Sequence, residues 1–415
     1  MAPTDSVSVF AEGTFEEQIQ ELVNYIVRNR AEDDRAAFIR PFQDALKVGE
    51  GQKAIDEDEE KRRKVCSMVI AEVHGLGDGT EKEIEGFFNL IYAHLLTLYP
   101  STSPEAKQHI ESLLKAISAA SPEQTSIQYR ILSNLFNAVP RTSSLRLTVY
   151  RTLLDTAASH EDIDSLNLSR ADVGKWLEEW DVSADEKSAF LKSIADAYAK
   201  SDQFSQSYEY TLSYVRSLSA SSSDAQKAAV DAIALSLRLP NVYNFDALYK
   251  IDAVVALKDH ELFSLLQVFL SGGLTEFQSW EASHPGVIEK YNLDKSQLEH
   301  KIRLLTLASL GFQNVGQNLP YAKIGEVLQV DAAEVEKWVI DVIRADLLSG
   351  KLSQTKQTLY ITRSTARTFE REQWEALEKR LLAWKSGLNN VLEVVANARR
   401  QAGGHVPTQT AAATA

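Results

Sequence analysis

The histidines and the cysteine are the side chains with which this chain could bind a metal or attack a substrate. The eight histidines are scattered along the sequence, and no two lie four residues apart, so no helix would offer two imidazoles to one zinc ion. The His-Glu-x-x-His, His-x-His and nucleophile-elbow motifs are missing from the sequence. A lone cysteine, Cys66, can form neither an internal disulfide nor a cysteine metal cluster. We therefore predict no catalytic residues, no metal and no cofactor, and expect that the protein is not an enzyme.

Phosphate and nucleic-acid binding are also disfavoured by the sequence. The G-x-x-x-x-G-K-[ST] phosphate loop is absent, and the glycine-rich run Gly75–Gly79 follows a helical pattern rather than a strand. This run is therefore predicted to be a helix end and a turn. The chain has 58 acidic against 44 basic residues and a net charge of -14, whereas nucleic-acid binding needs a basic face.

One helix near the C-terminus, predicted over residues 370–400, has a feature that indicates binding to another protein. Its apolar residues alternate in steps of three and four, the spacing of a seam that faces another helix. The seam is long, which favours a partner outside its own small domain. We define the seam as these seven residues: Trp374, Leu377, Leu381, Trp384, Leu388, Val391 and Val395.

The rest of the chain is also predicted to be mainly helical. Helix start signals recur at Ser103-Pro104, Ser121–Gln124 and Ser183–Glu186, with segments of helical periodicity between them. We predict a flexible N-terminus (1–13) and a right-handed solenoid of helix pairs (14–294). An irregular helical domain is the alternative, because no repeat consensus is readable. The Gly-, Thr- and Ala-rich tail (401–415) is predicted to be disordered.

Residues 295–369 have the pattern of a winged helix. Helices are predicted over Leu298–Leu310, Tyr321–Leu328 and Ala332–Ser349, and strands over Lys351–Ser353 and Thr358–Ile361. The third helix is expected to direct five side chains inward: Val335, Val339, Ile340, Ile343 and Leu347.

A winged helix can bind DNA by placing its third helix in the major groove. Here that helix carries more acidic than basic residues, so it would repel phosphate. We favour pairing of a sheet edge with another chain over DNA binding. The predicted contact residues of this edge are Leu352, Gln354, Leu359, Tyr360 and Ile361.

A pair of tryptophans, a charged run and the lack of a targeting segment are three further features of the sequence. Trp176 and Trp180 lie four residues apart, which is compatible with a surface anchor and more typical of a helix packed in the core. The charged run in 49–64 is a switch or localisation signal, or, as we favour, a solvated loop that enters a helix. The N-terminus lacks a signal-peptide pattern and the longest nearly apolar run, Phe87–Leu98, is too short for a bilayer, so a cytoplasmic protein is expected.

Several segments resemble the PCI family, whose members are subunits of the proteasome lid, the signalosome and eukaryotic translation initiation factor 3. The resemblance is carried by Val335–Arg344, Gly350–Gln354, Arg367–Trp374 and Leu381–Lys385, and it is nearest to initiation factor 3. It implies a non-catalytic scaffold that acts in protein synthesis initiation on the small ribosomal subunit. It also implies partners among the other PCI subunits and the related MPN subunits. A PCI subunit of the signalosome or the lid, and a winged-helix regulator that binds nucleic acid, are the alternatives.

Overall fold

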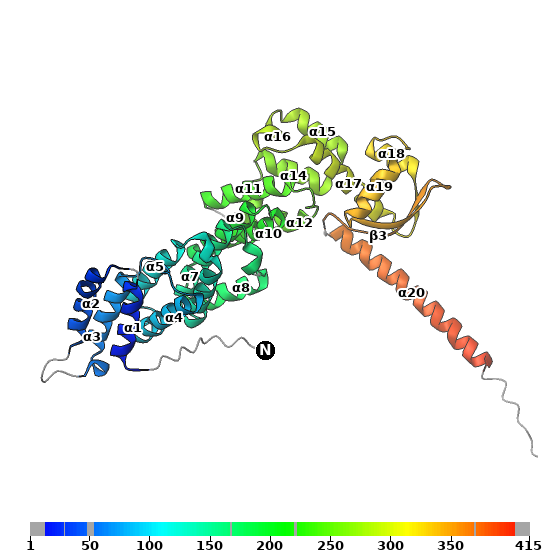
Figure 1. The fold of residues 1–415 in the computed structure, drawn as a ribbon. Helices are drawn as coiled ribbons and strands as arrows, with labels where there is room; N and C mark the ends of the chain where they lie inside the picture. The colour runs from blue at the N-terminus through cyan, green and yellow to red at the C-terminus, as the bar shows by residue number, and fades with distance from the viewer. Residues whose placement is uncertain are drawn as a thin grey trace, which may run out of the picture. The chain divides into compact units, whose positions relative to one another are not determined.

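The computed structural model describes residues 13–28, 30–47, 54–166, 168–219, 222–368 and 371–402. The chain divides into two compact units, Met1–Ser219 and Ala220–Ala415, and the division falls in a serine-rich stretch of the sequence (Figure 1). The predicted boundary between residues 294 and 295 lies inside the second unit, because helices on both sides of it pack together. Apart from residue 13 and residues 401–402, the predicted flexible ends lie outside the described residues.

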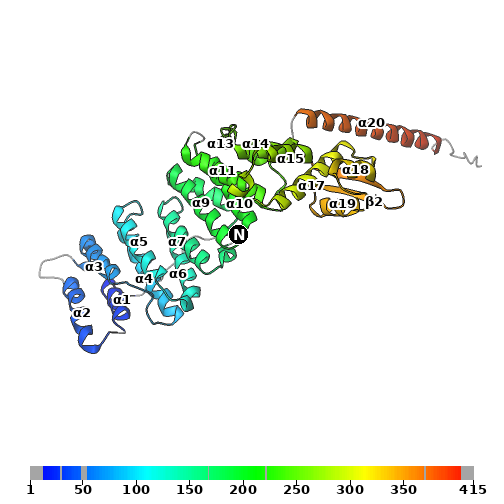
Figure 2. The same ribbon diagram turned by 90° about the horizontal axis from the view of Figure 1, so that it is seen from above.

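The first unit consists of helices that stack side by side in chain order (Figure 2). Their apolar faces form one continuous core from Phe15 to Leu153 and a second cluster from Leu147 to Tyr210. The predicted helical architecture is confirmed. The α-helices are α1 (Phe15–Val27), α2 (Glu32–Leu46), α3 (Glu59–Ala71), α4 (Glu81–Leu98), α5 (Pro104–Ser118), α6 (Thr125–Ala138), α7 (Leu145–Ser159), α8 (Arg170–Glu179), α9 (Ala184–Lys200) and α10 (Phe204–Ser217), with short 3-10 turns at Ile55–Glu57, Pro122–Gln124 and Ile163–Leu166.

Most of the predicted helix starts form as expected. Ser103 caps α5, and Ser183 and Glu186 form a capping box at α9. The box predicted at Ser121 does not form, because Pro122–Gln124 is a 3-10 turn that precedes α6.

The charged run enters a helix, as the interpretation that we favoured requires. Asp58 accepts a hydrogen bond from the backbone N–H of Lys61 at 3.1 Å and thereby caps α3. Acidic residues fill the first turn of this helix, where the helix dipole favours negative charge.

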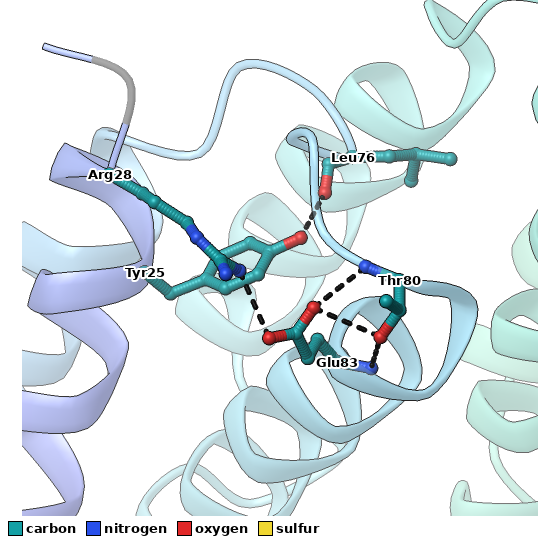
Figure 3. Close-up of polar contacts among 5 residues, drawn as sticks. All are labelled: Tyr25, Arg28, Leu76, Thr80 and Glu83. Atoms are coloured by element: carbon teal, nitrogen blue, oxygen red, sulfur yellow. Dashed lines mark hydrogen bonds and ion pairs between the residues drawn. The ribbon is translucent and has the colours of Figure 1, made fainter.

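The glycine-rich run forms the loop between α3 and α4, where a tyrosine from α1 fixes it (Figure 3). The Tyr25 hydroxyl donates to the carbonyl of Leu76 at 2.8 Å. Arg28 pairs with Glu83 at 3.0 Å, and Glu83 also accepts a hydrogen bond from the backbone N–H of Thr80 at 2.7 Å. The loop is therefore a structural turn, as predicted.

Trp176 of α8 and Trp180, the residue after that helix, belong to the core. Trp180 is 2% exposed, and Trp176 stacks on it with ring centroids 6.0 Å apart. Both rings contact Phe136, and Trp176 also lies 5.0 Å from Tyr150. The core interpretation of this pair is confirmed.

The second unit begins with seven described helices and continues into a winged helix. Most apolar residues of α14 and α17 are buried in its core. The elements before the sheet are α11 (Ser223–Arg238), α12 (Asp246–Tyr249), α13 (Asp252–Val255), α14 (Glu261–Ser271), α15 (Leu274–Ser283), α16 (Val287–Lys290) and α17 (Lys295–Gln313), and the winged helix adds β1 (Asn318–Pro320), α18 (Tyr321–Leu328), α19 (Val335–Arg344), β2 (Leu348–Ser353) and β3 (Thr358–Ser364).

The third helix of the winged helix differs from its prediction. It starts at Val335 and ends at Arg344, although we predicted Ala332–Ser349. Asp346 has a positive φ of 54°, which breaks the helix before the two leucines that follow. The inward face is made by Val335, Val339 and Val342, whereas Ile340 is 41% exposed.

The three strands form an antiparallel sheet in the order β1-β3-β2. β3 is the central strand, and β2 is an edge strand that is interrupted by an irregularity between Ser349 and Gly350. After β3 the chain forms α20 (Arg371–Ala402), the longest described helix. Among the described helices, none is both long and apolar enough to cross a membrane.

Candidate protein-interaction site

All seven seam residues lie on α20 and all are exposed. The least exposed is Leu377, at 37%, and the most exposed is Trp384, at 67%. Large apolar side chains elsewhere in the described chain are mostly buried, so α20 carries most of the exposed large apolar side chains. A helix with this surface is typical of a segment that becomes buried against other helices.

The apolar surface of α20 is wider than the predicted seam. Leu382, Leu392 and Val394 are 57%, 64% and 67% exposed. We did not predict them, because they fall outside the alternating spacing of three and four. With helical geometry, Leu392 extends the seam, whereas Leu382 and Val394 lie on other faces.

The predicted contact residues of the sheet divide into two groups. Leu352, Gln354 and Tyr360 are exposed. Leu359 and Ile361 are fully buried, which corrects the prediction that they contact another chain. Strand alternation directs these two side chains into the core of the winged helix.

The sheet itself places a second limit on edge pairing. Because β3 lies between β1 and β2, the backbone of Thr358–Ile361 is already hydrogen-bonded on both sides. The part of the prediction that assigned edge pairing to this segment is therefore wrong. The edge strands are β2, which includes Leu352, and the three-residue β1, and each of them pairs only with β3 in this sheet.

The electrostatics of the third helix do not favour DNA. α19 contains two acidic residues, Glu336 and Asp341, and two basic residues, Lys337 and Arg344, so it carries no net positive charge. Arg344 lies 3.8 Å from Asp341, so its charge is partly compensated. A surface with this balance would not attract a phosphate backbone.

Metal and thiol chemistry find no support in the geometry. Among the residues that the structure describes, no group of three or more His, Cys, Asp or Glu side chains could hold a metal ion. Cys66 is buried in the core of the first unit, and burial raises the pKa of its thiol to about 12. The thiol therefore stays protonated and unreactive at neutral pH.

Family models match the two segments that carry the exposed surface. The PCI domain matches residues 282–363, which include the winged helix. The model described as "eIF3 subunit M, C-terminal helix" matches residues 367–395, which include the whole seam.

Comparison with whole proteins decides the family. The chain is 31% identical to eukaryotic translation initiation factor 3 subunit M of Phaeosphaeria nodorum over 405 residues, which are 95% of this chain and 89% of the relative. This chain belongs to the initiation factor 3 subunit M family. The subunit M proteins of Aspergillus terreus (32% identical; 96% of this chain and 89% of the relative) and Dictyostelium discoideum (31%; 77% and 80%) are similar to it as well.

Membership of the subunit M family confirms the resemblance to initiation factor 3 that the sequence indicated. The similarity extends over nearly the whole chain, whereas the segments that carried the resemblance in the sequence lay between residues 335 and 385. The helical first unit is thus as much a part of the family as the winged helix and α20.

Proposed function

We propose that this chain is a non-catalytic scaffold subunit of eukaryotic translation initiation factor 3. Its task is to hold other subunits in place while the complex acts on the small ribosomal subunit during initiation. The observation that carries the proposal is the exposed apolar surface of α20, a segment that matches the subunit M helix model. A scaffold of this kind acts in the cytoplasm and needs no cofactor.

The partners of α20 are proposed to be helices of other PCI and MPN subunits. Burying one large apolar side chain fully is worth roughly 1.5–3 kcal/mol, so the half-exposed residues of the seam would each contribute about 1 kcal/mol. Seven such residues together would give about 7 kcal/mol before the entropy lost on association is subtracted. A micromolar contact needs about 8 kcal/mol net, so the seam would hold the chain in its complex together with further contacts and not by itself.

A second contact is proposed at the edge of the winged-helix sheet. The outer side of β2 can pair with a strand of a neighbouring subunit, and Leu352 would add an apolar contact there. Gln354 in the wing turn lies 3.5 Å from Glu336 of α19, so the turn and the third helix form one continuous surface.

Purification of the tagged full-length chain from its own cells tests the proposal. Mass spectrometry should identify the other subunits of initiation factor 3 together with proteins of the small ribosomal subunit. Recovery of signalosome or proteasome-lid subunits in their place would contradict the assignment to this complex. Recovery of the tagged chain by itself would contradict the scaffold function.

A further inference from the structure

A buried arginine lies where the chain passes from the winged helix to α20. Arg367 follows β3 and donates from Nε to the carbonyl of Leu305 at 2.9 Å and from one terminal nitrogen to Thr306 Oγ1 at 3.2 Å. Its other terminal nitrogen donates to the carbonyls of Gly272 and Phe269. One side chain thus links the start of the connection to both α14 and α17.

The chemistry of this contact requires arginine. Gly272 is the C-cap of α14, and the last carbonyls of a helix lack partners within that helix and carry partial negative charge. A guanidinium has five donors in a fixed plane, so it can bind several carbonyls at once. Burial lowers the pKa of Arg367 to about 10, which still leaves it charged at neutral pH.

A second arginine, which is exposed and lies within α20, also binds a carbonyl at a helix end. Arg380 donates to the carbonyl of Phe312 at 2.8 Å, and its guanidinium lies 4.9 Å from the centre of the Phe312 ring. Phe312 is in the last turn of α17. The two arginines are thirteen positions apart and contact two different helix ends.

Apolar packing does not fill the junction between these contacts. An open groove of about 1300 Å³ lies there, lined by residues of α14, α15, α17 and the first turns of α20. Arg367 and Arg380 both line this groove, as does Trp280. Their hydrogen bonds therefore attach the connection and α20 to the helices on the other side of this groove.

We propose that Arg367 and Arg380 form a clamp that sets the direction in which α20 leaves the second unit before any partner binds. Arg367 holds the connection that precedes α20, and Arg380 holds the helix itself, so the direction of α20 is restricted at two places. A single attachment would leave a pivot. A helix held in its bound direction loses less freedom on association, so the clamp preorganises the seam. The benefit to assembly rests on the proposed function, but the clamp itself is a property of the isolated chain.

Distance measurement between two spin labels on the full-length chain tests the clamp. Labels on cysteines introduced at Lys323 in α18 and Glu393 in α20 report the direction of α20, and the parent chain checks that buried Cys66 takes no label. The wild-type pair should give one narrow distance distribution, and the double variant R367Q/R380Q a broad one. A broad wild-type distribution, or a double variant as narrow as wild type, would overturn the proposal.

Two single variants keep this test decisive. Arg371 is 92% exposed and pairs with Glu375 of its own helix, so R371Q is the matched control and should stay narrow. R380Q alone removes one attachment without touching the buried arginine, so it should broaden the distribution even if R367Q impairs folding. If R380Q leaves the distribution unchanged, the two-point clamp is wrong.

Assembly gives an independent readout. The double variant should bind its partner subunits about tenfold more weakly while its seam is unaltered. Unchanged affinity would contradict preorganisation. A different result would contradict the proposed scaffold function. In that case substitutions in the seam would leave assembly unchanged, while the label distances would still respond to the clamp variants.

Discussion

Replacing Gly79 by alanine should destabilise the first unit, although no functional group is lost. A Cβ at this position would lie 2.9 Å from the Tyr25 hydroxyl oxygen, 3.0 Å from the ring and 3.2 Å from the Cβ of Glu83. The ring cannot turn away freely, because its hydroxyl binds the carbonyl of Leu76 and its face stacks on Phe87 with centroids 4.4 Å apart.

The magnitude follows from these contacts. Overpacking in a well-packed site costs about 1–3 kcal/mol, and loss of the tyrosine hydrogen bond adds about 1 kcal/mol. G79A should therefore lower the free energy of unfolding by about 2–4 kcal/mol. G77A should cost about 1 kcal/mol more, since Gly77 also has a φ of +78° and meets the same ring at 2.9 Å.

The matched control is G75A in the same loop, because a Cβ on Gly75 meets no atom within 4 Å. The measurement is a urea titration of the full chain in which hydrogen-exchange mass spectrometry detects the unfolding of peptides from residues 60–98. These peptides report the stability of the first unit separately from that of the second. G75A should behave like wild type, and Y25L should reduce the effect of G79A by removing the clash. Equal effects of G75A and G79A would refute the steric reasoning.

Two further predictions concern buried ionisable side chains. Burial lowers the pKa of His94 to about 4 in the folded chain, whereas a histidine in the unfolded chain has a pKa of about 6.5. Between these two pH values the unfolded chain binds a proton that the folded chain does not, so the free energy of unfolding falls as the pH falls. H94L should reduce this loss by roughly 3 kcal/mol in urea titrations at pH 6.5 and 4; an unchanged pH dependence would contradict it. The Lys301 ammonium donates to the carbonyls of Ser236, Leu237 and Leu239 at the end of α11, so K301M should lower the unfolding free energy by roughly 2–4 kcal/mol, whereas a shift within error would contradict its capping function.

Local signals in the sequence were sufficient for most of the helices. Tyr321–Leu328 was predicted with the bounds that it has, because Pro320 fixes its start and apolar spacing marks its face. The helix after it was predicted too long. Leu347 and Leu348 continue the apolar spacing of α19, but Leu347 directly precedes β2 and Leu348 is its first residue. The helix breaks at Asp346 because of the backbone conformation of that residue, and the sequence has no glycine or proline there.

Features that depend on tertiary contacts were not predictable in this way. β1 (Asn318–Pro320) has three residues and no strand pattern, and it exists because β3 pairs with it. That pairing makes β3 central, so its backbone is not available to a partner. Strand alternation directs Leu359 and Ile361 into the core, whereas Tyr360 between them is exposed. Arg367 gave no signal by itself either, because its carbonyl partners are about 60 to 100 residues away in the sequence.

The seam was predictable for the opposite reason. Its spacing is local, so the regular apolar stripe along one face of the helix can be recognised from the sequence alone. What the sequence could not give was the exposure of that stripe in the folded chain, where Leu381 is 52% and Leu388 45% exposed. An exposed stripe, and not a covered one, is what the scaffold function needs.

The central claim is that the seam of α20 holds the chain in its complex. The direct measurement compares the subunits that copurify with tagged L381D/L388D and with K379D/S386D, which places the same two aspartates on the opposite, exposed face of the helix. We expect that L381D/L388D folds but loses its partner subunits, while K379D/S386D keeps them. Retention of the partners by L381D/L388D would contradict it.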